Sequence, residues 1–235
     1  MINKLCMCGC NFIVNNSRNN YINGHNSRKY TINHNAFDNL NSEEVCYWVG
    51  FIAADGSLDI KNKVLTIKLA PKDYGHLVKF SKFINSNRPI NILVNTTSQP
   101  ELRINSNNIY DTLCSYGIIP NKSERDFSIT NDTLINSKDF WRGVIDGDGC
   151  LSFDTGKRLI IHLCGNYALL LQYVKFVYVN VKVNLNIRPV GNIYQVALCG
   201  SNAIKLVSLL YKDSVMYLDR KMELAKTIFK CFRED

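Results

Sequence analysis

The chain has 235 residues, which is enough for one or two domains with a sizeable hydrophobic core. Hydrophobic residues make up 46% of the sequence and charged residues 20%, a balance that excludes intrinsically disordered and collagen-like chains. The net charge is +8, and the basic residues are spread along the whole chain. This charge favours a polyanionic partner, with nucleic acid ahead of an anionic membrane.

Cysteine usage and hydropathy predict the compartment. Nine cysteines are an odd number and most stand singly in apolar segments, so we expect reduced thiols rather than a disulfide framework. No stretch approaches the roughly 18 apolar residues of a spanning helix, and the N-terminus lacks the apolar core of a secretory signal. We therefore expect a protein of the cytoplasm, or of an equivalent reducing compartment of a host or organelle, with no membrane partner.

The first regular pattern begins after about 40 polar, Asn-rich residues. Residues 45–58 predict an aromatic-rich helix that ends at Asp55-Gly56 and runs directly into an alternating strand pattern. Two strand pairs follow, and a helix comes after each pair. The predicted ranges are 57–61 and 64–69 for the first pair, 72–85 for its helix, 91–96 and 101–105 for the second pair, and 107–116 for the last helix.

A second segment repeats this order. Residues 139–151 predict another aromatic-rich helix, which ends at Asp148-Gly149. Strands are expected at 150–154 and 158–164, a helix at 167–179, strands at 184–188 and 193–199, and a helix at 202–211. Both halves therefore read α-β-β-α-β-β-α, which a tandem duplication explains. A final amphipathic helix is expected over 217–232. We divide the chain into an N-terminal extension, 1–40, and two repeats, 41–136 and 137–235.

Strict alternation in the strands predicts an α+β fold with two antiparallel sheets, each with one buried and one solvated face. Leu102 and Ile104 face the core in one strand, for example, while Glu101 and Arg103 face outward. The outward faces carry amide, hydroxyl and basic side chains, which form hydrogen bonds with phosphates and base edges. An ordinary solvated face is the alternative for any single strand. The DNA-binding candidates are Thr66, Lys68, Arg103, Asn105, Arg158, Asn186, Arg188 and Gln195.

Small residues recur four positions apart on both aromatic-rich helices, at Gly50 and Ala54 and at Gly143 and Gly147. This spacing places them on one face, so the two helices are expected to pack closely against each other. Asp55 and Asp148, in the last turns, would then lie side by side.

Two adjacent carboxylates at helix C-termini repel each other and oppose the helix dipoles, so they need a compensating charge. A hard divalent cation such as Mg²⁺ supplies it, because it binds carboxylate and phosphate oxygens together. The alternative is that each Asp-Gly only ends a helix and turns the chain. Its occurrence at the same point of two matching repeats favours the metal site.

The two helix segments, WVGFIAADG (Trp48 to Gly56) and WRGVIDGDG (Trp141 to Gly149), resemble two LAGLIDADG motifs. With the order of elements, the resemblance covers about residues 28–230. It implies a single-chain LAGLIDADG homing endonuclease whose two pseudo-symmetric halves form a saddle over DNA. The departures are tryptophans in place of the leading Leu, Arg142 in place of an Ala, and Ala53 in place of the first Asp. Both penultimate acids of the motif are present.

The resemblance also implies site roles. Asp55 and Asp148 would bind the metal, with the carbonyls of Ala54 and Gly147 as auxiliary ligands. The active-site lysines would be Lys122 and Lys221, and Lys68 and His162 align with positions that organise the attacking water. A lysine supplies positive charge to the developing phosphorane, and metal ions generate hydroxide and stabilise the leaving oxygen. The alternative for each lysine is a solvated surface residue.

The N-terminal segment offers a second metal-binding hypothesis. Cys6, Cys8, Cys10 and His25 have the types and number of a closed zinc site, with His34 as another candidate for the fourth ligand. CMCGC followed by NGHN also resembles a short Cys/His extension found on some phage-type homing endonucleases. Loose thiols in a polar tail are the alternative. Because this polar segment cannot bury much of a hydrophobic core, zinc or DNA would be needed to order it.

The sequence as a whole predicts a monomeric, Mg²⁺-dependent endonuclease that makes a staggered double-strand break in a long, asymmetric DNA site. Two different halves on one chain need no symmetric target. Two alternatives stay open: a maturase-like protein of the same fold that binds intron RNA, and a catalytically silent DNA-binding regulator.

Overall fold

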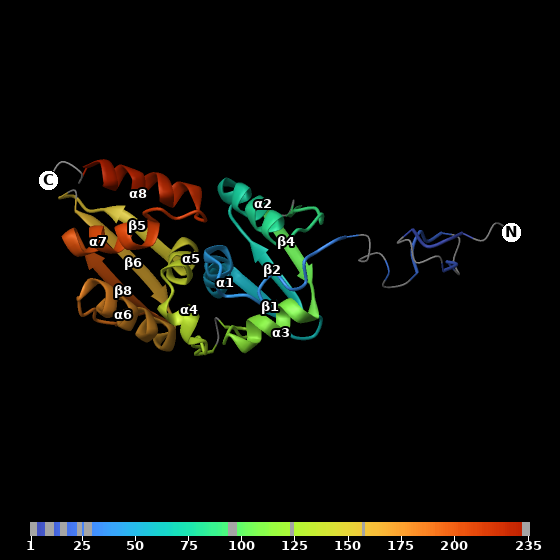
Figure 1. Cartoon of the computed structure of the whole chain (residues 1–235), viewed down its shortest axis with the longest axis horizontal. Coiled ribbons are helices and arrows are strands. Elements are labelled where there is room, and N and C mark those ends of the chain that lie inside the picture. The colour runs from blue at the N-terminus through green and yellow to red at the C-terminus, as the bar shows by residue number, and fades with distance from the viewer. Residues whose placement is uncertain are drawn as a thin grey trace.

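The structure, a computed structural model, describes residues 4–7, 12–14, 18–22, 25, 30–93, 98–122, 125–156 and 158–231. It has two similar halves, each with a four-stranded antiparallel sheet covered by helices, and the helices α1 and α5 lie side by side between them (Figure 1). The described part of 4–25 lies at the far end of the molecule, beyond the first half (Figure 1).

The first half contains α1 (Glu43–Asp55), β1 (Gly56–Asp59), β2 (Val64–Lys68), a 3₁₀ turn η2 (Pro71–Asp73), α2 (Tyr74–Phe83), β3 (Asn91–Leu93), β4 (Gln99–Asn105) and α3 (Asn107–Ser115). The strand order in its sheet is β1-β2-β4-β3. Alternate residues of β4, including Leu102 and Ile104, are buried beneath the helices, as the sequence predicts. Ser106 caps α3, because its hydroxyl accepts a hydrogen bond from Ile109 N.

The second half contains α4 (Asp132–Asn136), α5 (Lys138–Asp148), β5 (Gly149–Phe153), β6 (Leu159–Gly165), α6 (Tyr167–Val181), β7 (Arg188–Val190), β8 (Ile193–Cys199), α7 (Gly200–Tyr211) and α8 (Asp219–Cys231). The strand order is β5-β6-β8-β7, which matches the first sheet element for element. The α+β class and the duplicated α-β-β-α-β-β-α order are therefore confirmed.

One strand prediction is wrong. Residues 184–187 form no strand, and β7 begins only at Arg188. Leu185 and Ile187 are half-buried and pack against the core, and the pairing with β8 is confined to Arg188–Val190. Pro189 fits β7 because an edge strand can leave one backbone donor position unused.

The helices α1 and α5 approach each other backbone to backbone. A Cβ added at Gly50 would overlap the Phe140 carbonyl oxygen, and a Cβ at Gly143 would overlap the Tyr47 carbonyl oxygen and lie 2.7 Å from Phe51 N. Only glycine permits this spacing on both helices. The predicted close packing of the two motif helices is confirmed.

Two segments outside the predicted helices and strands complete the core. Phe37, from the segment before α1, is fully buried against Phe80 and Phe83, and its carbonyl accepts a hydrogen bond from Tyr116 Oη. The helix α4, absent from the sequence predictions, packs on α5 and α6 through the buried Leu134. The predicted boundary at 136/137 stays a prediction.

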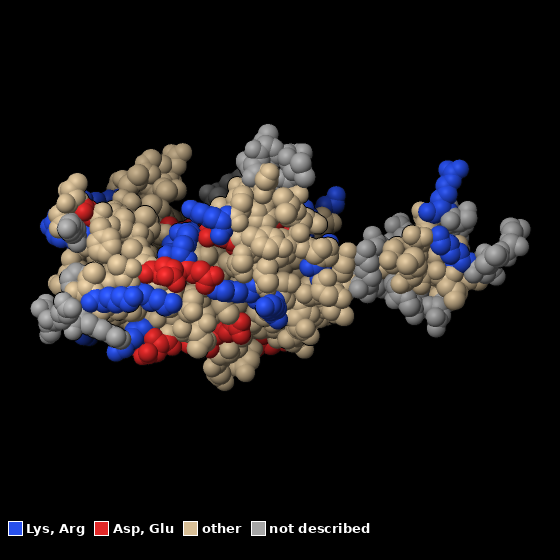
Figure 2. Space-filling model, turned by 90° about the horizontal axis from the view of Figure 1, so that it is seen from above, with Lys and Arg blue, Asp and Glu red and all other residues tan. Residues whose placement is uncertain are grey.

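Ion pairs join the two halves on the surface where α2 and α8 meet. Lys79 Nζ lies 2.5 Å from Asp219 Oδ1, and Arg220 Nε lies 3.1 Å from Asp73 Oδ1. Acidic and basic side chains accordingly lie next to each other in the middle of this face (Figure 2). Within the described part of the chain, no helix is long and apolar enough to cross a membrane.

Candidate active site

Asp55 and Asp148 are the last residues of α1 and α5, and each helix passes directly into a strand at the following glycine. Gly56 and Gly149 have ordinary extended backbone angles, so a positive φ is not the reason for glycine here. The reason is space. A Cβ at Gly56 would lie 2.7 Å from the Ile52 carbonyl oxygen, and one at Gly149 would lie 2.6 Å from the Ile145 carbonyl oxygen.

The two carboxylates lie close together at the end of the helix pair. A Cβ on Gly147, the residue before Asp148, would overlap the Ala54 side chain and lie 3.4 Å from Asp55 Oδ2. Although both side chains keep contact with solvent, the protein around them reduces their hydration. This loss of hydration, and then the charge of Asp148, raise the pKa of Asp55 to about 6. The pKa of Asp148 is also raised, chiefly by lost hydration.

Lys122 caps the C-terminus of α1. Its Nζ donates hydrogen bonds to the carbonyl oxygens of Ile52 (2.8 Å), Ala53 (2.6 Å) and Ala54. The segment after α3 positions it, because Ile118 is buried and Asn121 takes a left-handed conformation, φ 55°, just before the lysine. An ammonium here satisfies free carbonyls and the negative end of the helix dipole.

Lys221 caps α5 in the same way. It lies in the first turn of α8, is buried, and donates to the carbonyl oxygens of Ile145, Asp146 (2.8 Å) and Gly149 (2.6 Å). Burial lowers the pKa of Lys221 and of Lys122 to about 8 each, although nearby carboxylates partly oppose the shift. The structure therefore brings both predicted lysines to the helix ends that carry the two acids.

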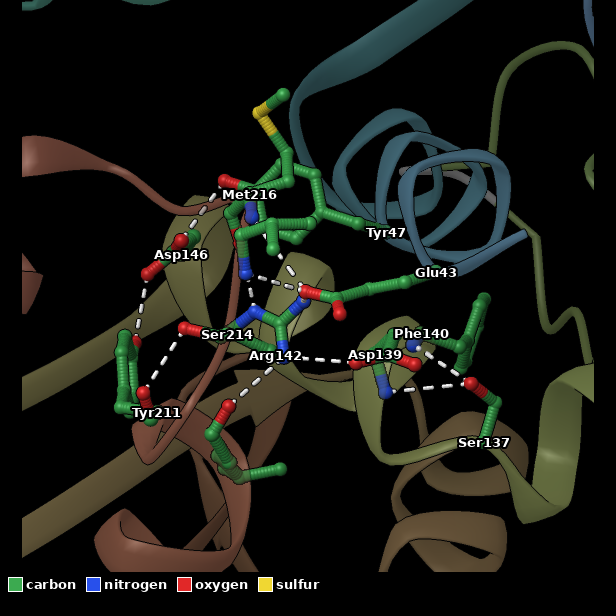
Figure 3. A network of polar contacts seen from close by, with 12 residues as sticks. Glu43, Tyr47, Ser137, Asp139, Phe140, Arg142, Asp146, Tyr211, Ser214 and Met216 are labelled. Atoms are coloured by element: carbon green, nitrogen blue, oxygen red, sulfur yellow. Dashed lines mark hydrogen bonds and ion pairs between the residues drawn. The ribbon is translucent and has the colours of Figure 1, made fainter.

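Asp146 anchors the segment that carries Lys221. Its buried carboxylate accepts hydrogen bonds from Tyr47 Oη (2.7 Å) and Tyr211 Oη (2.6 Å) (Figure 3). It also accepts one from Leu218 N (2.7 Å), just before α8. Tyr47 belongs to the first half, so this carboxylate also ties the halves together. Tyr47 Oη in turn accepts from Nε2 of the buried His76, at 2.9 Å.

Arg142 is a second buried polar group between the halves. Its guanidinium donates to Glu43 of α1 (2.7 Å), to Asp139 (2.8 Å) and to the carbonyl of Met216 (2.8 Å) (Figure 3). It also donates to the carbonyl of Leu210, at 2.8 Å. Sequence reasoning noted Arg142 only as a departure from the motif, and it missed Asp146 altogether. Charged residues on an aromatic-rich helix that is expected to pack closely against another helix were the available signal.

Comparisons with known proteins show which solved structures share this arrangement. No family model matches the sequence, and no curated protein matches it. Solved structures do match. The I-LtrWI LAGLIDADG homing endonuclease bound to target DNA superposes with a TM-score of 0.59 at 12% identity, covering 83% of this chain and 92% of that one. The meganuclease I-SmaMI bound to uncleaveable DNA gives 0.55 at 12% identity, covering 78% and 88%. Full-length DUF199/WhiA from Thermatoga maritima gives 0.50 at 16%, covering 84% and 66%.

The chain has the LAGLIDADG fold. At these identities the likeness establishes the fold alone, and it confirms the resemblance that the two motifs indicated. Within the LAGLIDADG fold the residues at the helix ends must carry any argument about chemistry.

The strand registers show whether Lys68 and His162, the remaining catalytic candidates, occupy matching positions in the two sheets. Gly56 pairs with Ile67 in the first sheet and Gly149 pairs with Leu163 in the second. Lys68 in the first sheet consequently matches Cys164 in the second, and His162 in the second matches Thr66 in the first. Lys68 and His162 therefore do not occupy equivalent positions in the two repeats. Their predicted roles toward the attacking water stay predictions.

The other DNA-binding candidates lie mostly on the solvated faces. Thr66, Arg103 and Asn105 point away from the core, and Gln195 lies on the matching face of β8. Arg188 is exposed at the start of β7. Arg158 is exposed before β6 and pairs with Asp154, with Nε 2.9 Å from Oδ2. Asn186 is exposed but lies outside the strands, in the segment that the sequence assigned to one.

A cleft of about 520 Å³ opens beside Asp148. Ala54 and Lys122 line it from the first half, together with Arg125, and Tyr167 and Tyr194 line it from the second half. It gives solvent and ligands a route to one carboxylate of the LAGLIDADG helix pair.

The zinc hypothesis rests partly on Cys8 and Cys10, which lie outside the described residues. Cys6 Sγ lies 3.9 Å from His25 Nδ1. His34, the other candidate ligand, instead lies against the first half, with Nδ1 2.8 Å from Ser106 Oγ. Zinc binding by the N-terminal segment stays a prediction.

Proposed function

We propose that the chain is a metal-dependent DNA endonuclease that makes a staggered double-strand break in a long, asymmetric site. One observation carries the proposal: two carboxylates, one from each half, lie together at the ends of two helices packed backbone to backbone, and a lysine caps each of these ends. A purely structural pair of acids would be poorly placed there, because like charges and helix dipoles both disfavour it.

The residues at the helix ends fit Mg²⁺. Among the described residues no cluster of three or more His, Cys, Asp or Glu side chains is found, but Mg²⁺ needs only one or two carboxylates when phosphate oxygens and water complete its shell. Asp55 and Asp148 would hold it, with the carbonyls of Ala54 and Gly147 beside them. The Ala54 carbonyl already accepts a hydrogen bond from Lys122. When bound, the metal would supply a hydroxide nucleophile and charge stabilisation for the leaving oxygen.

The chain's own groups would position the substrate and balance its charge. Lys122 and Lys221 are fixed by carbonyl hydrogen bonds within the same turns that hold Asp55 and Asp148. Their lowered pKa values keep a proton available to exchange near neutral pH. The outward faces of the two sheets would hold the duplex so that one phosphodiester of each strand lies at the helix ends.

A cleavage assay with and without Mg²⁺, beside an intron-RNA binding assay, tests this function. The DNA that flanks the gene is the first substrate to try. Mg²⁺-dependent double-strand breaks at one site support the proposal. DNA binding without cleavage in Mg²⁺ or Mn²⁺ would favour a silent regulator, and selective binding of intron RNA without cleavage would favour a maturase-like protein.

Acidic pH is expected to weaken Mg²⁺ binding, because protons compete with the metal for the Asp55 carboxylate. Below its pKa of about 6 the Asp55 carboxyl carries a proton and is neutral, so it cannot attract a cation. We expect Mg²⁺ affinity to fall about tenfold between pH 8 and pH 5, since protons occupy about nine-tenths of the sites one pH unit below the pKa. Isothermal titration with Mg²⁺ at both pH values measures it. Equal affinities would contradict the assignment of Asp55 to the metal.

DNA affinity is expected to fall steeply with salt. The net charge is +8, and Lys68, Arg103 and Arg188 lie exposed on the sheets, so binding should release several counterions from the phosphates. A plot of log affinity against log salt concentration, measured by fluorescence anisotropy with a duplex, should have a slope of about −4 or steeper. A slope near zero would exclude binding through the phosphate backbone.

A further inference from the structure

The outward side chains of the two sheets form rows across the strands, and the rows of one sheet match those of the other. Ser57, Thr66 and Arg103 form one row, and the next contains Asp59 and Asn105, with the buried Val64 between them. The matching rows of the second sheet are Cys150, His162 and Ala197, and then Ser152, Ile160 and Cys199. A third pair of rows contains Lys68 with Glu101 and Cys164 with Gln195.

This correspondence exposes a chemical difference between the sheets. The outward positions of β4 are Gln99, Glu101, Arg103 and Asn105. At the matching positions β8 has Ile193, Gln195, Ala197 and Cys199. Three of the four charged or amide side chains of β4 are thus replaced by short or apolar ones on β8, and only the position of Glu101 keeps a polar side chain, Gln195.

The apolar side chains on the outward face of β8 are separate from those of its core face. The core face of β8 is formed by Val196 and Leu198, which are buried. On the opposite face Ile193 is 46% exposed, and its cross-strand partner Val190 is 48% exposed. Ala197 and Cys199 are exposed as well. The outward face of β8 thus has an exposed apolar pair, Val190 and Ile193, at one end and the small Ala197 and Cys199 at the other, with Gln195 between them.

Double-stranded DNA offers an apolar group of matching size. The C5 methyl of thymine projects into the major groove, where alanine and other small apolar side chains contact it, whereas arginine and asparagine read guanine and adenine through paired hydrogen bonds. Ala197 and Cys199 are too short to make paired hydrogen bonds to a base. Arg103 and Asn105, at the matching positions of the first sheet, have the required donors.

We propose that the second sheet recognises its half of the target through thymine methyl groups, contacted by Ala197, Cys199 and Ile193, while the first sheet reads purine edges through Arg103 and Asn105. The inference rests on the proposed function, because it requires double-stranded DNA over both sheets. It assigns the two halves of the site different chemistry: thymine-rich under the second sheet and mixed under the first.

Selection from a randomised duplex library with the whole protein, in Ca²⁺ instead of Mg²⁺, tests the base preferences. Ala197→Arg, an exposed substitution, should change preferences in only one half of the selected site and so identifies the half under the second sheet. Arg103→Ala is the matched control and should relax preferences in the other half. We expect the half affected by Ala197→Arg to be enriched in A·T pairs.

Replacement of thymine by deoxyuridine then removes the methyl groups without changing the hydrogen bonds. With the unsubstituted protein, each replacement under the second sheet should weaken binding about fourfold, the change expected for burial of one methyl group. Replacements in the other half should leave affinity unchanged. If the selected sites show no A·T enrichment, or if deoxyuridine weakens binding equally in both halves, the inference is overturned but the proposed endonuclease function stands. Absence of any DNA binding overturns both.

Discussion

Asp55→Asn and Asp148→Asn should each abolish double-strand cleavage, with rate losses on the order of 10³-fold or more. The amide keeps the size of the side chain but removes the charge that would hold the metal. The carboxylates lie at the protein surface and, among the described residues, make none of the hydrogen bonds that join the halves, so folding and DNA binding should persist. Plasmid or duplex cleavage at saturating Mg²⁺, with affinity measured in parallel, gives both quantities.

The same substitutions should raise thermal stability. The folded protein holds Asp55 with a pKa of about 6, above that of an unfolded aspartate, so the ionised form is less favourable in the fold. This destabilisation is absent at low pH and develops as pH rises through about 6. At pH 8 Asp55→Asn should therefore have a higher Tm than the unsubstituted chain, and Mg²⁺ should raise the Tm only of the latter. Wild-type cleavage in either variant would refute the catalytic assignment. A lower Tm with equal loss of DNA binding would indicate a structural role.

Gly143→Ala should be strongly destabilising. The added Cβ would overlap the Tyr47 carbonyl oxygen and approach Phe51 N, and both are backbone atoms that cannot rotate away. The helices α1 and α5 would have to separate, which opens the packing between the halves. We expect a loss of about 4 kcal/mol or more in the free energy of unfolding, and the same for Gly50→Ala.

Gly75→Ala is the matched control, because Gly75 lies in α2 and a Cβ there would meet nothing within 4 Å. It should be neutral or stabilise by up to about 1 kcal/mol through helix propensity. Urea unfolding followed by circular dichroism gives all three free energies. A Gly143→Ala protein as stable as Gly75→Ala would show that the two helices are not in backbone contact.

Local patterns in the sequence determined the elements and the pair of acids. Strict alternation identified the buried residues of β4, because side chains of a strand point to opposite faces whatever the rest of the fold does. The Asp-Gly at the end of each aromatic-rich helix located Asp55 and Asp148 by the same kind of argument. Duplication then gave their proximity, since small residues four positions apart on two helices favour close packing.

Only the tertiary structure decided what surrounds these acids. Lys122 and Lys221 reach the helix ends from segments far away in the sequence, and nothing in their own neighbourhoods specifies the carbonyls that they cap. The buried Asp146 is satisfied by Tyr47, Tyr211 and Leu218 N from three separate elements. Such contacts depend on how elements pack, which sequence periodicity does not encode.

The difference between the two sheets is also a tertiary result. The sequence shows the outward residues of each strand, but alternation alone leaves open which residue of β6 lies beside which residue of β8. The observed register matches Ala197 with Arg103 and Cys199 with Asn105. The sequence by itself determined that each sheet has a solvated face. The pairing of the strands determined that the two faces differ, because hydrogen bonding across the ladder fixes which side chains lie in one row.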